Sequence, residues 1–415
     1  MALGRQVWVV LHRWSGLSIA LFLAVAGITG AFLAFMHELE PLTAPAVFRV
    51  TPPGTGAPPL DGFALRDRLL ARYPGAVITE VPLHIDPHAS VRFGMQRFDP
   101  ADQTLGPYAE DWDEVFVNPY DGTETGRRLW GDIGQGAINI MPFVNKVHFT
   151  LALGEAGRLA FGIAALIWTL DCFVGFALTL PPRSPFKQRT GGKGWFAQWR
   201  TSWGIRWRGG PYKRDMDLHR SSGLWAWPLL LVFAWSGVAF NLPQAYDPVM
   251  ATFGYQPIAA GIEPPRSGHG GPGDDFRAAA TNGRLIAERA TKAAGAVIDE
   301  SGPAAIIQYP QFGVYLYRFT SDASVSDTYG DSLVIFSALT GEPLKIVLPR
   351  RDKAGMALNA WLEALHYGAV WGLPYKIAVS LIGMAVTLLT VTGVIIWTRK
   401  RAARLMRRQR HATSN

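Results

Sequence analysis

The sequence predicts a membrane α-helical protein: a four-helix bundle with a pseudo-two-fold repeat, joined to two extramembrane α+β modules. Three observations predict this class. The chain has 415 residues, 49% of them hydrophobic and only 17% charged, which is too apolar for a soluble domain and too charged for a chain embedded throughout. Four apolar runs are long enough to cross a hydrocarbon core of a membrane. Short motifs also recur in the two halves of the chain.

The clearest repeat joins two strings that each open an apolar run. Leu11-His12-Arg13-Trp14-Ser15-Gly16-Leu17 returns 207 residues later as Leu218-His219-Arg220-Ser221-Ser222-Gly223-Leu224, with six of seven positions identical. Val147-His148-Phe149 and Leu365-His366-Tyr367 form a second pair at an offset of 218, and Gly175 and Gly393 align at that same offset. The chain is therefore predicted to contain two copies of one unit, with a histidine at the mouth of each of four membrane helices.

The predicted elements alternate between membrane helices and extramembrane parts. They are a first membrane helix (1–39, apolar core 17–36), a first α+β module (40–147), a second helix (148–182, core 159–180), a basic, Trp-rich connection (183–218), a third helix (219–242, core 223–242), a second module (243–365), a fourth helix (366–398, core 376–397) and a basic tail (399–415). The first apolar run is long and lacks a small-residue cleavage site, so we expect an anchor rather than a removed signal peptide.

Charge predicts the orientation of the helices. The N-terminus, the 183–220 connection and the tail after Trp397 carry 19 Lys and Arg against two Asp, whereas the two large loops are net acidic. Positive charge concentrates on the cytoplasmic side of membrane proteins, so both termini are expected inside and both modules outside. The basic composition is then a topology signal and requires no nucleic-acid partner. A single cysteine, Cys172, excludes intramolecular disulfides.

Each outer module is expected to hold a helix followed by a small antiparallel sheet. Pro/Gly-rich linkers open the modules at Thr51–Pro59 and Pro264–Gly273, and helix-like segments follow at Gly62–Tyr73 and Asp275–Ala294. The predicted strands are Ala76–Val81, Val91–Arg97, Ala305–Tyr309 and Val314–Phe319, and the predicted closing hairpins are Val115–Thr123 and Val334–Glu342. Neither module carries a Ser/His/Asp, paired-carboxylate or zinc signature.

Five of the nine histidines lie at predicted helix ends: His12, His37, His148, His219 and His366. A single such histidine is ordinarily an interfacial ring, and a proton relay is an alternative role. The repeat changes this expectation, because an axis along the membrane normal places His12 opposite His219 inside and His148 opposite His366 outside. Haem iron accepts an imidazole on each face, so the two pairs predict two haems. His37, whose repeat position is Gln244, is a third outer candidate.

Three charged residues accompany the inner histidines. Arg13 and Arg220 follow them directly and are candidates for pairing with haem propionates, although they would serve equally as positive-inside anchors. Asp171 lies in the inner half of a predicted helix, where a carboxylate is costly and usually faces a partner. We expect it to orient an inner ligand histidine or to meet Arg13 or Arg220.

Four tryptophans recur at every fourth position of the basic connection: Trp195, Trp199, Trp203 and Trp207. On a helix they would form one aromatic stripe beside basic residues, which is typical of a segment in the cytoplasmic headgroup layer. A more specific alternative is that these tryptophans and basic residues form a docking surface for an electron donor.

Taken together, these motifs resemble the bacterial PepSY-associated transmembrane proteins, a family that includes iron-regulated inner-membrane ferric-siderophore reductases. The resemblance covers essentially the whole chain and rests on His12-Arg13-Trp14-x-Gly16-Leu17, His219-Arg220-x-x-Gly223-Leu224, His148-Phe149, His366-Tyr367-Gly368 and Thr392-Gly393-x-x-x-Trp397-x-Arg399. It implies two periplasmic PepSY-like modules and two b-type haems held by the paired histidines. Electrons would then pass from the cytoplasmic side to a periplasmic ferric siderophore, and ferrous iron would be released.

The resemblance also implies partners and a location. The partners are a ferric siderophore, membrane lipid and a separate electron donor, either a flavoprotein or a quinol, because this chain ends in a basic tail where some relatives continue into a flavin reductase domain. The location is the inner membrane of a bacterium. Two other functions stay open: a non-enzymatic PepSY membrane sensor or protease regulator, and a siderophore or metal permease.

Overall fold

The computed structural model describes residues 2–54, 56–102, 104–182, 194–262 and 275–413. The chain divides into two compact units, and each unit takes segments from both halves of the sequence. Unit 1 contains Met1–Ala34, Lys146–Tyr246 and Lys376–Asn415. Unit 2 contains Phe35–Asn145 and Asp247–Tyr375.

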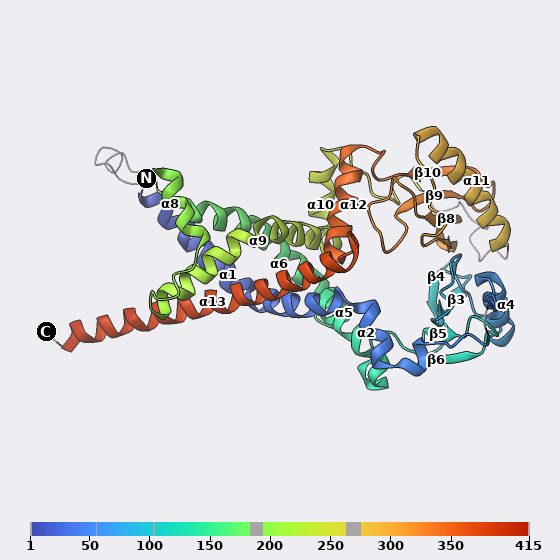
Figure 1. The fold of residues 1–415 in the computed structure, drawn as a ribbon, viewed down its shortest axis with the longest axis horizontal. Coiled ribbons are helices and arrows are strands. Elements are labelled where there is room, and N and C mark those ends of the chain that lie inside the picture. Colours follow the sequence, from blue (N-terminus) through green and yellow to red (C-terminus); the bar gives the residue numbers. More distant parts are fainter. Residues whose placement is uncertain (1, 55, 103, 183–193, 263–274, 414–415) are drawn as a thin grey trace. The chain divides into compact units, whose positions relative to one another are not determined.

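Four long helices form most of unit 1, and they run side by side in Figure 1. They are α1 (Ala2–Leu33), α6 (Gly154–Thr179), α9 (Pro211–Asn241) and α13 (Gly372–Thr413). The shortest has 26 residues and extends about 39 Å, more than the roughly 30 Å of a hydrocarbon core. All four are long and apolar enough to cross a membrane. The four predicted spans are thus confirmed as candidate membrane-spanning helices.

The inner histidines lie inside long helices rather than at their mouths. α1 begins at Ala2, ten residues before His12, and α9 begins at Pro211, eight residues before His219. Pro211 suits this start, because proline at the first helical position has no amide hydrogen to leave unpaired. The sequence placed the start of the third helix too late, at 219, since a polar His-Arg pair does not end a helix when the backbone hydrogen bonds continue through it.

The outer histidines lie on separate short helices that precede the long ones. These are α5 (Ile140–Thr150), which carries His148, and α12 (Ala354–Tyr367), which carries His366. Leu151 and Ala152, with φ of 54° and 57°, end α5, and Gly368, with φ of 70°, ends α12. A left-handed residue interrupts the helical hydrogen bonds. The expected continuous helices from 148 and from 366 are therefore each broken after their histidine.

Small residues let the long helices of unit 1 approach closely. A Cβ atom added to Gly27 in α1 would lie 2.6 Å from the carbonyl oxygen of Gly383 in α13, and one added to Gly383 would lie 2.5 Å from that of Gly27. The buried interior combines small and aliphatic side chains: Cys172, Ala226, Leu230, Ala234 and Val386. Packing through small residues is the usual means of helix association in membranes.

The Trp-rich connection forms a short helix followed by one turn of 3₁₀ helix, α8 (Trp195–Arg200) and η3 (Thr201–Trp203). The ring centroids of Trp199 and Trp203 lie 5.4 Å apart, and Trp203 lies 4.9 Å from Trp225 of α9. Trp207 falls outside this array and is 67% exposed. The predicted four-residue stripe is therefore correct only through Trp203, because the helix ends before Gly204.

In unit 2, the first extramembrane segment forms helices and two small sheets. Its helices are α2 (Met36–Thr43), α3 (Pro45–Phe48) and α4 (Gly62–Arg72), with 3₁₀ turns η1 (Ile133–Gln135) and η2 (Ala137–Asn139). Its strands are β2 (Val91–Gly94), β5 (Glu114–Val117) and β6 (Glu124–Arg128) in one antiparallel sheet, and β3 (Gln96–Asp99) with β4 (Thr104–Pro107) in a hairpin. Leu65 and Leu69 of α4 pack on Val115 and Val117 of β5, so one helix covers one face of this sheet.

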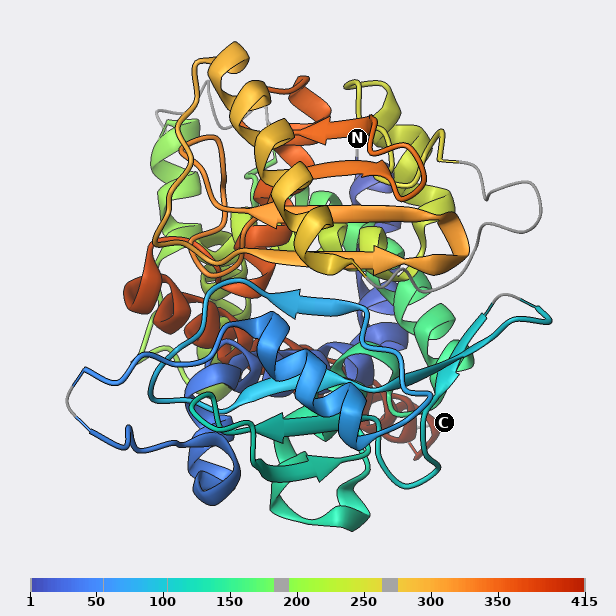
Figure 2. The same cartoon turned by 90° about the vertical axis from the view of Figure 1, so that its right-hand side faces the viewer.

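The second segment forms the larger sheet of unit 2. Its strands are β7 (Ala305–Tyr309), β8 (Val314–Phe319), β9 (Ser332–Ser337) and β10 (Pro343–Val347), and its other elements are α10 (Pro243–Ala251), α11 (Phe276–Ala294) and η4 (Pro310–Phe312). Figure 2 shows α11, in gold, lying across one face of these strands. The expected linker Pro264–Gly273 lies outside the described residues.

One strand of the first segment belongs to the sheet of the second. β1 (Glu80–Pro82) pairs antiparallel with β7, which gives the order β1-β7-β8-β9-β10. Val81 is fully buried in the core of this sheet together with Ile306 and Phe319. The sequence predicted two separate copies of a helix and a sheet, whereas the structure joins the two segments through a shared strand.

Candidate functional site

Two histidines of unit 1 lie together although 207 residues separate them. The rings of His12 on α1 and His219 on α9 have centroids 6.0 Å apart and planes inclined at 59°. Both helices pack against α6, and this shared contact brings the rings to one place. The structure therefore assembles the predicted inner pair.

Each of these two rings is fixed through its Nδ1 atom. Nδ1 of His12 lies 3.0 and 2.9 Å from the two carboxylate oxygens of Asp171. Nδ1 of His219 lies 3.0 Å from the carbonyl oxygen of Leu389 and 3.2 Å from Oγ1 of Thr392. An ionised carboxylate and a carbonyl accept hydrogen bonds and cannot donate them, so Nδ1 carries the proton in both rings. The lone pair of each imidazole is then on Nε2, the atom that a metal would bind.

Glycines lie against both rings at repeat-equivalent positions. A Cβ atom added to Gly175 would lie 3.3 Å from Cε1 of His12, and one added to Gly393 would lie 3.4 Å from Cε1 of His219. Both distances are tighter than ordinary van der Waals contact. Alanine at either position would push the ring, so the glycines hold the imidazoles close to α6 and α13.

The inner pair fits a haem iron in separation and in supporting hydrogen bonds. Imidazoles that bind one iron from opposite faces have ring centres about 6 Å apart, because each nitrogen lies ~2 Å from the metal. The observed separation is 6.0 Å. Metal-ligating histidines generally donate their second ring N–H to a carboxylate or a backbone carbonyl, as His12 and His219 do. The donor set therefore suits two axial ligands of one haem.

The arginines after these histidines have unused donors. Nε of Arg13 and Nε of Arg220 are both buried and have no hydrogen-bond partner among the described residues. The rest of the Arg220 guanidinium is engaged, since Nη2 donates to Asp217 at 2.8 Å and to the carbonyl of Thr201 at 3.0 Å. A buried unpaired donor is costly, and two at repeat-equivalent positions fit an anionic group such as a haem propionate.

Asp171 contacts a histidine rather than an arginine. Besides His12, its carboxylate accepts a hydrogen bond of 2.7 Å from Oγ of Ser15, and the residue is only 9% exposed. No ion pair joins it to Arg13 or Arg220 in the described part of the chain. Of the two partners that the sequence left open, the structure selects the histidine.

His148 has an equivalent arrangement elsewhere in unit 1. Its Nδ1 lies 2.8 Å from Oγ1 of Thr29. That hydroxyl donates to the carbonyl of Val25 at 2.6 Å, so it accepts from His148. A Cβ atom added to Gly30 would lie 3.1 Å from Cε1 of His148. His148 therefore shares with the inner pair a fixed Nδ1 and a glycine against the ring.

His366 lies in the last turn of α12, which belongs to unit 2. The ring of Tyr367 lies 6.0 Å from it, and the ring of Tyr329 lies 6.2 Å from Tyr367. Burial, with a further contribution from Glu363, raises the pKa of both tyrosines. These phenols therefore stay neutral hydrogen-bonding groups beside His366.

A polar loop between β8 and β9 holds the chain just after His366. The amide of Asp327 donates to the carbonyl of Ala369 at 2.9 Å, and its carboxylate accepts from the amide of Gly372 at 2.9 Å. These two bonds fix the junction between α12 and α13.

His37, the third outer candidate, is exposed on α2. It makes no hydrogen bond with any other residue that the structure describes. Its Nδ1 is therefore not fixed by a hydrogen bond, whereas Nδ1 of His12, of His148 and of His219 is.

The sequence as a whole identifies the group of proteins to which the chain belongs. Residues 9–400 match the family model described as PepSY-associated TM region. The chain belongs to the PepSY-associated transmembrane family. No curated protein matches it. The match includes all four paired histidines, so the site described above lies within the family region.

Several residues that support the histidines of this PepSY-associated transmembrane chain were not predicted from sequence. They are Ser15, Thr29, Leu389 and Thr392. One signal was available: position 389 lies 218 residues after Asp171, the same offset that relates His148 to His366. The role of Leu389 does not show in its residue type, because the atom that contacts His219 is its backbone carbonyl oxygen.

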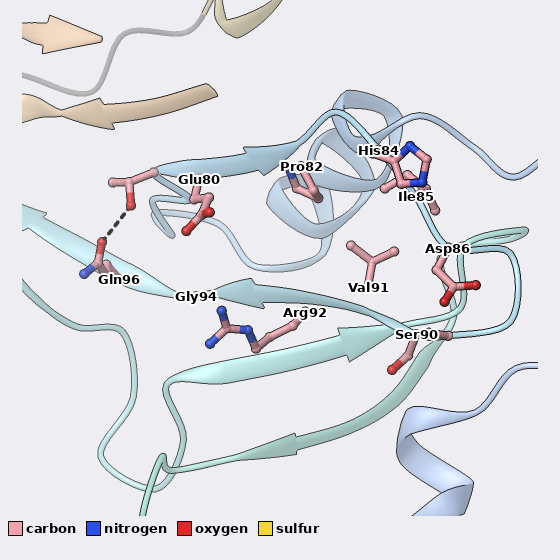
Figure 3. Close-up of a pocket in the computed structure, with 12 residues that line it drawn as sticks. Glu80, Pro82, His84, Ile85, Asp86, Ser90, Val91, Arg92, Gly94 and Gln96 are labelled. Carbon is pink, nitrogen blue, oxygen red and sulfur yellow. Dashed lines mark hydrogen bonds between the residues drawn. The ribbon is translucent and has the colours of Figure 1, made fainter. Parts of the chain in front are cut away.

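A polar cavity also lies in unit 2, and none of the predicted ligands is among its lining residues. A cavity of about 340 Å³ lies between β1 and β2 and is lined by Glu80, His84, Asp86 and Arg92, among others, as Figure 3 shows. Two of its charges are paired: Glu80 with Arg318 at 2.8 Å and Arg92 with Glu114 at 2.5 Å. Asp86 accepts a hydrogen bond of 2.8 Å from the amide of His88 and forms no ion pair with any described residue.

Proposed function

We propose that the chain is a di-haem inner-membrane reductase that moves electrons from the cytoplasmic side to a periplasmic ferric siderophore and releases ferrous iron. The observation that carries the proposal is the inner histidine pair. His12 and His219 come from distant helices, approach to 6.0 Å and both direct Nδ1 to a hydrogen-bond acceptor. A sensor has no need for two imidazoles in this arrangement, whereas a permease could use them on its pathway.

The inner haem would be held by Nε2 of His12 and of His219. Haem supplies one-electron transfer through the ferric and ferrous states of its iron. The protein's contribution is to fix both imidazoles through Asp171 and Leu389 and to present the unpaired Nε atoms of Arg13 and Arg220 to the propionates. Hydrogen bonds that fix the two imidazoles should limit the reorganisation that accompanies binding.

The outer haem is assigned to His148 and His366 on the sequence repeat. Support on the side of unit 1 comes from Thr29 and Gly30, which fix His148 as described above. His37, which is exposed, stays an alternative outer ligand.

The reduction itself is a one-electron step. A donor on the cytoplasmic side, a flavoprotein or a quinol, is oxidised, and ferric iron in the siderophore gains one electron to become ferrous. Ferrous iron is a softer cation that binds hard oxygen ligands less strongly, so the siderophore releases it. The two extramembrane segments are proposed to be PepSY-like modules that face the periplasm.

The visible spectrum of the purified full-length protein tests the proposal. After expression with adequate haem, we expect sharp reduced α and β bands and about two b-type haems per chain. H219A and H366A should each lose one haem, and the two variants should lose different ones, which redox titration of the remaining haem distinguishes.

A matched control is H88A, because His88 is exposed on a loop of unit 2 and should leave both haems in place. A wild-type protein without haem bands would reject the reductase and favour the sensor or permease functions. Retention of both haems in H219A would reject the inner ligand assignment.

A further inference from the structure

The two inner histidines are equivalent in the repeat but donate to chemically different acceptors. Nδ1 of His12 meets the carboxylate of Asp171 at 2.9 Å, and Nδ1 of His219 meets the backbone carbonyl of Leu389 at 3.0 Å. Positions 171 and 389 are themselves equivalent, at an offset of 218. The same place beside each ring thus holds a carboxylate in one half of the chain and a neutral carbonyl in the other.

The carboxylate of Asp171 interacts mainly with His12. The carboxylate is 9% exposed, and its partners in the described residues are His12 and the hydroxyl of Ser15, 2.7 Å away. No lysine or arginine of the described chain forms an ion pair with it. A buried anion without a cationic partner interacts strongly with the nearest acidic proton, and here that proton is on Nδ1 of His12.

A charge-assisted hydrogen bond is stronger than a neutral one and draws the Nδ1 proton away from the ring. The imidazole then becomes more basic at Nε2 and donates more electron density to a bound metal. More electron density stabilises ferric over ferrous iron. The carbonyl of Leu389 has the same position but a smaller effect, because it carries only a partial charge.

We propose that Asp171 makes His12 the more strongly donating inner ligand and thereby lowers the reduction potential of the haem held by His12 and His219. Asp171 is then a positioning residue that acts through His12. The inference rests on the proposed function, because it needs a haem at this pair. Nδ1 of His148 meets the neutral hydroxyl of Thr29, and His148 also forms a hydrogen bond with the neutral backbone of Ala26, so the lower of the two potentials is expected at the inner haem, at the donor end of the route.

Potentiometric titration of the reduced α band in full-length, haem-loaded protein tests this inference. D171N keeps an acceptor oxygen of the same size and removes the charge. We expect both haems to be retained and the ferrous-to-ferric ratio of one haem, at a fixed potential, to rise about tenfold, which corresponds to about 59 mV for a one-electron couple. T392V is the matched control: it removes a neutral hydroxyl beside His219 and should change the ratio by less than about twofold.

S15A provides an independent test with the opposite sign. Without the Ser15 hydroxyl, Asp171 has one competing donor fewer and should accept more strongly from His12, so the same midpoint should fall. Two haems with an unchanged midpoint in D171N would overturn the inference and leave the proposed function intact. If D171N loses a haem, S15A decides, and an unchanged midpoint there overturns the inference. Absence of haem from the wild type would instead reject the proposed function.

Discussion

At the scale of single residues, Glu363 predicts how stability depends on pH. Burial, and then the nearby charge of Asp331, raises its pKa from 4.5 to about 6. The folded chain therefore holds this proton more tightly than the unfolded chain, and the resulting stability is present below about pH 4.5 and is lost as pH rises through about 6. The loss at pH 7.5 is about 2 kcal/mol.

E363Q removes this titration and keeps the size of the side chain. We expect the thermal midpoint of the wild-type protein to fall relative to that of E363Q between pH 4.5 and 7, as measured by intrinsic fluorescence in detergent. E342Q, at an exposed site in the same unit, should follow the wild type. Parallel pH curves for wild type and E363Q would contradict the assignment.

The candidate ligands could be read from the sequence because a repeat marks them, and Asp171 was an expected partner, but which of its possible partners it meets could not be read. Histidines followed by arginine recur in both halves, and that identity is visible without a structure. The pairing of Asp171 with His12 depends on the rotation and crossing of α1 and α6, to within about one hydrogen-bond length. Propensity and periodicity do not contain this information.

At the scale of elements, the crossing of α1 and α13 makes a prediction about helix packing. G383A would place a Cβ atom 2.5 Å from the carbonyl oxygen of Gly27, and a backbone atom cannot move aside as a flexible side chain can. The helices must separate, at a cost of about 1–3 kcal/mol. We expect a lower thermal midpoint, as measured by intrinsic fluorescence in detergent.

G16A is the appropriate comparison for G383A. Gly16 also lies within a long helix, but a Cβ atom added there would meet nothing within 4 Å. Alanine has the higher helix propensity, by up to about 1 kcal/mol, so G16A should be neutral or slightly stabilising. Equal loss of stability in both variants would show that helix contact at Gly383 is not the cause.

Element ends were predicted less well than element types, for physical reasons. The strands β7 and β8 match their predicted ranges, because alternation within Ala305–Tyr309 and Val314–Phe319 is bounded by proline and glycine. The break after His148 was missed, since Leu151 and Ala152 adopt positive φ without being glycine. The equivalent break after His366 has a glycine at its cap, Gly368, and is the easier of the two breaks to predict from the sequence.

At the scale of the whole molecule, the shared strand β1 predicts coupling between segments far apart in sequence. Val81 is fully buried in the core that contains Ile306 and Tyr317. V81A should cost about 2 kcal/mol and loosen the sheet of the second segment although the change lies in the first. Hydrogen exchange by mass spectrometry should show faster exchange in β7 and β8.

V115A serves as the control, because Val115 is equally buried but belongs to the core beneath α4. Its effect should be confined to β2, β5 and β6. If V81A also speeds exchange only in the first segment, the two segments are stabilised independently.

The four candidate membrane-spanning helices were accessible from sequence because hydropathy is a strong signal. The merging of the two extramembrane segments was not, because the pairing of β1 with β7 joins residues more than two hundred positions apart. A three-residue strand such as Glu80–Pro82 carries too little pattern to specify its partner. The strand pairs with the sheet edge at which Val81 becomes buried.

The contrast between Asp171 and the carbonyl of Leu389 also bears on how such a protein can change over generations. A carboxylate is encoded, so one codon substitution can remove it. A main-chain oxygen is present whatever residue occupies the position, and only a distortion of α13 would displace it. The His219 side of the site is thus resistant to point mutation, and the His12 side is adjustable.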